Sequence, residues 1–157
     1  MSKAAAKTGA GPNFVVALEQ FIPKEHRILV DEYAYSILPA EFKLLIWLFS
    51  SPKTRDWYIH LCEKIAPGLW GGMLFRKRYI DEIIEKNIHE VKEIVNLGAG
   101  SDTRAFRLKK LAEIPVWEVD LPSNIHFKKV QLQRIFGNIP AHIHLVATGL
   151  ARLHRFK

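Results

Sequence analysis

The spacing of hydrophobic and polar residues divides the chain into two regions with different periodicity. Residues 13–90 carry long apolar runs at helical spacing and few clusters of β-branched residues. Helix-breaking residues interrupt these runs at Pro23, Pro39, Pro52 and the Pro67–Gly68 pair. We therefore expect this region to be helical, in segments that end near these prolines.

Residues 91–148 follow an alternating pattern instead. Short apolar runs predict three strands, at 93–97, 116–119 and 143–147. The stretches between them predict helices, and the second has Pro122 in its first turn and Gly137 just past its end. Alternating strands and helices predict a parallel sheet with right-handed crossovers, hence an α/β fold of Rossmann-like type. The helical region is expected to cover this sheet or to cap its ligand-binding edge.

Composition narrows the class of protein. The chain has 157 residues, enough for one core, with 48% hydrophobic and 25% charged residues. No apolar run approaches the ~20 residues of a membrane helix. Residues 1–12 lack the apolar core of a signal peptide and predict a flexible tail; together with the single Cys62 they favour a cytoplasmic protein. The net charge is +7, but the basic residues are scattered, so we expect neither a specific nucleic-acid partner nor a membrane.

Candidate chemistry lies at the ends of the first two predicted strands. Gly98 and Gly100 follow the first strand, where glycine permits a sharp turn and a close approach of backbone N–H groups to a ligand. Asp102 comes next. Its side chain could cap the following helix or contact a cofactor, and the sequence favours the two roles equally. Asp120 closes the second strand, ~5 Å away, and can accept both hydroxyls of a ribose. The pattern predicts a nucleoside cofactor.

The residue at position 103 bears on which nucleoside this is. The dinucleotide fingerprint places its third glycine there, under a pyrophosphate, and this chain has Thr103. S-adenosylmethionine has no pyrophosphate and tolerates the change. An NAD-type oxidoreductase is the first alternative. A non-enzymatic binding module, built from the helical region and the basic residues 149–157, is the second.

The stretch "VNLGAGSDTRAFRL" followed by "VWEVDLP" resembles the S-adenosylmethionine-dependent methyltransferases of the leucine carboxyl methyltransferase type, and within them the polyketide-synthesis O-methyltransferase-like branch. The resemblance covers residues from about 25 to about 147. It implies methyl transfer to a carboxylate or hydroxyl oxygen of a small molecule, with S-adenosylmethionine as cofactor. The residues it places at the cofactor are Gly98, Ala99, Gly100, Asp102, Arg104, Asp120 and Leu121.

A predicted helix around residues 73–88 contributes one further candidate cofactor-binding residue. Its apolar stripe consists of Ile80, Ile83 and Ile84. Arg76 shares that face and needs a partner, either an internal carboxylate or the carboxylate of a ligand. Arg78 is expected to face water and to pair with Glu82. In the resembling family an arginine on this helix holds the carboxylate of the cofactor's methionine tail, so we assign that role to Arg76 rather than Arg78.

Other conspicuous side chains are given structural roles. His142 and His144 share a face of the third strand, but no further ligand completes a metal site, so we expect a polar strand entrance and no metal. The aromatic residues of the helical region are expected in the core, and an apolar acceptor pocket is the alternative role for them: Trp47, Trp57, Tyr58 and Trp70. No catalytic base can be assigned.

The end of the chain departs from the resembling family. The full fold has a seven-stranded sheet, whereas about three strands are predicted here, and Gly149 stands where an acidic residue is usual. A truncated reading frame would explain both departures. We therefore expect a marginally stable chain with an open, apolar sheet edge that binds S-adenosylmethionine weakly or not at all.

Overall fold

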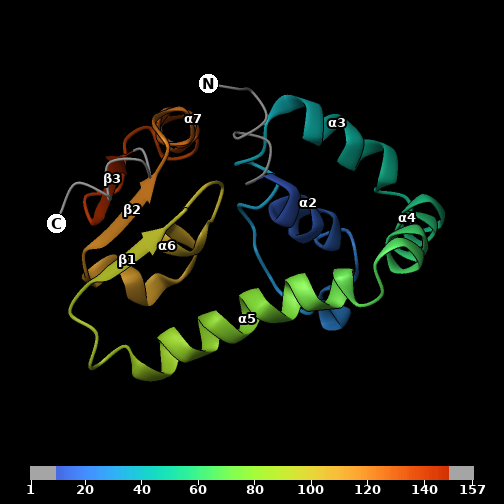
Figure 1. The fold of residues 1–157 in the computed structure, drawn as a ribbon, viewed down its shortest axis with the longest axis horizontal. Coiled ribbons are helices and arrows are strands. Elements are labelled where there is room, and N and C mark those ends of the chain that lie inside the picture. Colours follow the sequence, from blue (N-terminus) through green and yellow to red (C-terminus); the bar gives the residue numbers. More distant parts are fainter. Residues whose placement is uncertain (1–9, 149–157) are drawn as a thin grey trace, which may run out of the picture. The chain divides into compact units, whose positions relative to one another are not determined.

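The computed structural model describes residues 10–148, which form two compact units (Figure 1). The first unit spans residues 10–86 and is helical. The second spans residues 87–148 and contains the strands. Each unit has its own buried apolar residues and is described by itself.

The helical unit follows the predicted proline breaks. Its elements are α2 (Ala10–Glu19), η1 (Lys24–His26), α3 (Ala40–Phe49), α4 (Pro52–Ile65) and α5 (Leu69–Asn87). Pro23 and Pro39 immediately precede η1 and α3, and Pro52 is the first residue of α4, where its missing N–H group costs no hydrogen bond. The helical prediction for this region is confirmed. One boundary differs, because α2 begins at Ala10, inside the stretch predicted as a tail.

Helix α2 forms the centre of this unit and is surrounded by α3, α4 and α5 (Figure 1). Val16, Ala17 and Leu18 are completely buried. A helix that is apolar all round has no face suited to solvent, so other helices must cover it on every side. The residues that pack around α2 include Leu38, Ile46, Trp70 and Leu74.

The expectation that the aromatic residues form the core holds for only part of the set. Trp70 is buried and Tyr58 packs against the core. Trp47 and Trp57 are instead exposed, by 68% and 59%. The prediction fails for Trp47 and Trp57 because α3 and α4 each carry apolar residues on more than one face. The sequence pattern therefore does not show which face of these helices turns inward.

The second unit is a three-stranded parallel sheet, as predicted. Its strands are β1 (Ile94–Leu97), β2 (Val116–Asp120) and β3 (Ile143–Ala147), in the order β1-β2-β3. The connection from β2 to β3 is α7 (Pro122–Phe136), which ends at Gly137 with a φ of 78°. The connection from β1 to β2, predicted as one helix, is two short pieces: α6 (Arg104–Arg107) and η2 (Lys109–Glu113).

The strand order determines which face of the sheet is covered. Two consecutive right-handed crossovers that advance in the same direction lie on the same face. Val116, Glu118 and Ile143 on that face are buried. On the other face of β1, Val95 and Leu97 are 56% and 75% exposed. Within residues 10–148, no helix is both long and apolar enough to cross a bilayer.

Candidate functional site

The glycine turn after β1 is held against the end of β2. Gly98 and Gly100 have φ angles of 72° and 43°, in the left-handed region that glycine adopts most readily. The N–H groups of Gly98 and Ala99 both donate to the carbonyl oxygen of Val119, at 2.8 and 3.3 Å. The tips of β1 and β2 therefore form one connected backbone structure.

Asp120 binds this turn directly. Its Oδ2 accepts a hydrogen bond from the Gly100 N–H at 2.6 Å. Its Oδ1 accepts from the N–H of Leu121 at 2.6 Å and from the side-chain amide of Asn124 at 2.8 Å. An ionised carboxylate has about four acceptor positions, so these three donors fix its orientation and leave acceptor capacity for a ligand.

The position that a side chain would take at Gly98 is open. A Cβ atom at Gly98 would meet no other part of the protein within 4 Å. A ligand can therefore approach the backbone there, beside a carboxylate that is already oriented. This arrangement fits the ribose of a nucleoside such as S-adenosylmethionine. The structure thus brings together Gly98, Gly100 and Asp120, as the sequence predicts.

Asp102 and Arg104 form a second polar pair just beyond the turn. Asp102 Oδ1 accepts the Arg104 N–H at 2.8 Å, and its Oδ2 lies 3.0 Å from Nη1 of the same arginine. The carboxylate therefore serves a free N–H group of the first turn of α6, as expected, but the N-cap residue itself is Thr103. Thr103 is completely buried, at the position of the absent third glycine.

The predicted environment of Arg76 is wrong. Arg76 is exposed, and the proposed apolar stripe of Ile80 and Ile83 is also open to solvent. The buried face of α5 carries other residues: Trp70, Leu74, Lys77 and Asp81. Two of these are charged, which is why the apolar pattern pointed to the wrong face. Lys77 is accommodated there because its Nζ donates to Asn13 Oδ1 at 3.0 Å.

Arg78 behaves as predicted. Its Nε lies 2.7 Å from Glu82 Oε1, in an exposed pair one helical turn apart. Its Nη1 also donates to the carbonyl oxygen of Ile28 at 3.3 Å. Because these partners occupy it, Arg78 is the less suitable of the two arginines for a ligand.

The two histidines have separate local roles. A ring nitrogen of His142 lies 2.8 Å from the carbonyl oxygen of Ala105, which links the start of β3 to α6. The His144 ring stacks on Trp117 with centroids 4.3 Å apart. Over residues 10–148, no three His, Cys, Asp or Glu side chains are grouped so as to hold a metal ion.

Three residues near Asp120 were not identified from the sequence: Glu118, Asn124 and Lys128. Lys128 Nζ and Glu118 Oε1 are 2.6 Å apart, and both side chains are buried. Burial raises the pKa of the Glu118 carboxyl group, while the Lys128 ammonium acts in the opposite direction. The sequence feature that could have revealed this ion pair is Lys128, which shares the inner face of α7 with Ile125 and Leu132. A lysine buried there requires an acidic partner.

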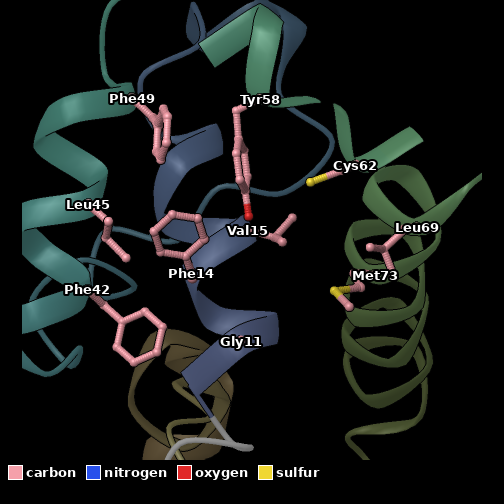
Figure 2. A pocket seen from close by; sticks show the side chains of 10 residues that line it. All are labelled: Gly11, Phe14, Val15, Phe42, Leu45, Phe49, Tyr58, Cys62, Leu69 and Met73. Atoms are coloured by element: carbon pink, nitrogen blue, oxygen red, sulfur yellow. The ribbon is translucent and has the colours of Figure 1, made fainter. Parts of the chain in front are cut away.

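The helical unit contains an apolar cavity of about 280 Å³ (Figure 2). It is lined by Gly11, Phe14, Val15, Phe42, Leu45, Phe49, Tyr58, Cys62, Leu69 and Met73. Tyr58 stacks on Phe49 with centroids 4.7 Å apart, and its hydroxyl group points toward Val15 in Figure 2. Burial and the neighbouring Cys62 raise the pKa of Tyr58 to about 12, so its hydroxyl stays protonated. The cavity suits an apolar group.

Comparison with known proteins decides the family. The family model of leucine carboxyl methyltransferases matches residues 11–155. The chain belongs to this family. The resemblance noted at the glycine turn and Asp120 is thereby confirmed, and the match extends through both units.

Individual relatives of this leucine carboxyl methyltransferase family member agree. "Leucine carboxyl methyltransferase 1" of Candida albicans is 40% identical over 74 residues, which are 45% of this chain and 20% of that protein. A "Putative S-adenosyl-L-methionine-dependent methyltransferase" of Mycobacterium avium is 27% identical over 137 residues, 83% of this chain and 44% of that protein. The chain therefore spans less than half the length of either relative.

Proposed function

We propose that this chain binds S-adenosylmethionine at the tips of β1 and β2 and acts in methyl transfer to an oxygen acceptor. The observation that carries the proposal is the Asp120 carboxylate, hydrogen-bonded to Gly100 beside the open space over Gly98. Family membership supports the same ligand. It gives no support to an NAD-type oxidoreductase or a basic binding module.

Each predicted site residue has a definite task in this proposal. The Asp120 carboxylate and the adjoining Leu121 hold the ribose side, and the Gly98–Ala99–Gly100 backbone lies against the nucleoside. Asp102 and Arg104 brace the turn through their mutual hydrogen bonds. Arg76, from the helical unit, binds the carboxylate of the methionine tail.

The acceptor class follows from the chemistry and from the relatives. Bound S-adenosylmethionine supplies an electrophilic sulfonium methyl group, and the protein supplies orientation and a dry environment. A carboxylate acceptor is ionised near neutral pH and needs no general base, whereas a hydroxyl acceptor needs one. Since the Candida albicans relative is named for a leucine carboxyl group, we propose a carboxylate acceptor, on a small molecule or a protein.

A thermal-shift screen tests the ligand. Because weak binding is expected, the screen uses millimolar ligand: S-adenosylmethionine and S-adenosylhomocysteine should each raise the melting temperature of the chain in a concentration-dependent way, and NAD should not. Asp120→Asn should abolish the shift, because its amide nitrogen cannot accept a hydrogen bond. The exposed Glu113→Gln is the matched control. Stabilisation by NAD alone would overturn the proposal.

A further inference from the structure

Two parallel polar contacts join β2 to α7. Glu118 and Asp120 lie two residues apart on β2 and therefore point to the same face of the sheet. Asn124 and Lys128 lie four residues apart on α7 and share one face of that helix. Glu118 pairs with Lys128 at 2.6 Å, and Asp120 pairs with Asn124 at 2.8 Å.

The inner of these contacts is a fully buried ion pair. The Lys128 and Glu118 side chains are 1% and 0% exposed. Moving two charges out of water costs several kcal/mol per ion, so such a pair contributes little stability compared with apolar residues of similar size. What a buried pair does well is fix one arrangement of two elements, because either charge left alone would be strongly destabilising.

Glu118 also retains an unsatisfied atom. Its Oε2 is buried and has no hydrogen-bond partner among the described residues. The charges of Asp102 and Arg104 reach it through space and act on its pKa in opposite directions. A half-satisfied buried carboxylate is unfavourable for folding and requires an explanation other than stability.

We propose that Glu118 and Lys128 are positioning residues for the ligand-binding acid. Their ion pair fixes the register of α7 against β2, so that Asn124 meets Asp120 and the Asp120 carboxylate stays turned toward Gly100. The inference rests on the proposed function, in which Asp120 receives the ribose hydroxyls. Glu118 and Lys128 act only through Asp120 and Asn124 and do not contact the ligand.

The test removes both charges together. The double variant Glu118→Leu/Lys128→Met keeps similar volume and leaves no buried charge unpaired, so it should fold. The control is Glu113→Gln/Lys129→Met, which changes an exposed acid at the end of η2, just before β2, and an exposed lysine of α7. In the ligand-free protein, NMR should show the Gly100 amide proton moved upfield and exchanging faster in the first variant only, because its bond to Asp120 is weakened.

A second measurement links the pair to the ribose. Affinities are measured for S-adenosylhomocysteine and its 2′,3′-dideoxy analogue, which lacks the hydroxyls that Asp120 would accept. The double variant should lose about tenfold affinity for the first ligand and under about twofold for the second. Equal losses for both ligands would mean a merely structural role and would overturn the inference.

A conservative variant covers the case in which the double variant fails to fold. Lys128→Arg retains the ion pair with Glu118 and should preserve the Gly100 signal and the ligand preference. A Gly100 signal unchanged in the folded double variant, or lost in Lys128→Arg, contradicts the inference. If the Gly100 signal responds as expected but the wild type binds neither ligand, the proposed function fails while the positioning of Asp120 by the pair stands.

Discussion

Single residues at the strand tips determine the geometry of the site. Gly98 and Gly100 take positive φ angles, and Asp120 accepts hydrogen bonds from three donors around them. Gly98 and Asp120 could be predicted because each directly follows an apolar run. The role of Asn124 could not be predicted, because it depends on how α7 packs against β2.

Gly98 should resist substitution for a conformational reason. Its φ of 72° is unfavourable for residues with a Cβ atom, although a Cβ there would meet open space. Gly98→Ala should therefore lower the free energy of unfolding by about 1–2 kcal/mol in urea denaturation. Gly72→Ala, at an open position within α5, should raise it by up to about 1 kcal/mol. Destabilisation by both substitutions would contradict this reasoning.

Glu19 should make stability depend on pH. Its carboxylate accepts the N–H groups of Ile28 and Leu29, at 2.8 and 3.3 Å. Burial outweighs these bonds and raises the pKa of Glu19 above its usual 4.5. The folded state then binds the proton more tightly than the unfolded state, so the contribution to stability is greatest below pH 4.5 and falls as the pH rises.

Denaturation of wild type and Glu19→Gln across this pH range measures the effect. The unfolding free energy of the wild type relative to the variant should fall as the pH rises from 4.5. A relative stability that increases with pH would show that the hydrogen bonds to Ile28 and Leu29 outweigh burial.

The two arginines of α5 should differ in their effect on ligand binding. Arg76 is exposed and is our candidate for the methionine carboxylate, whereas Arg78 is engaged with Glu82 and Ile28. Arg76→Ala should therefore weaken S-adenosylhomocysteine binding by at least about tenfold, and Arg78→Ala by less than about twofold. Equal losses in a binding titration would refute the assignment.

At the scale of elements, packing decides what the sequence pattern leaves open. The strands and the helix α7 follow from short apolar runs bounded by glycine and proline. The inward face of α5 does not, because it includes Lys77, which is satisfied by Asn13 from a helix 64 positions away in the sequence. Helix α3 is apolar at every position from Leu44 to Phe49, so its pattern alone does not show which side is buried.

The effect of substituting an aromatic residue of the helical unit on the free energy of unfolding should depend on how deeply that residue is buried. Phe14 contacts the rings of Phe42 and Tyr58, with centroids 6.0 and 5.8 Å away, and is buried in the core. Phe14→Ala should lower the free energy of unfolding by about 3–5 kcal/mol. Trp47→Ala, at a residue 68% exposed, should change it by no more than about 0.5 kcal/mol. Similar losses in chemical denaturation would contradict the assignment of the core.

At the scale of the molecule, the chain combines a helical unit with the three-stranded sheet that carries the predicted site. The α/β class, the parallel sheet and the family were accessible from the sequence, because alternating elements and a glycine turn followed by an acid are local features. The exposure of Val95 and Leu97 follows from the strand order, which places both crossovers on one face of the sheet.

The most direct test of the central claim is an NMR titration of the ¹⁵N-labelled chain with S-adenosylhomocysteine up to millimolar concentrations. We expect the amide signals of Gly98, Gly100 and Leu121 to shift together along one saturable curve, and to remain unchanged in Asp120→Asn. Signals that stay fixed in the wild type, or shift equally in the variant, would contradict the proposal that the glycine turn and Asp120 bind one nucleoside.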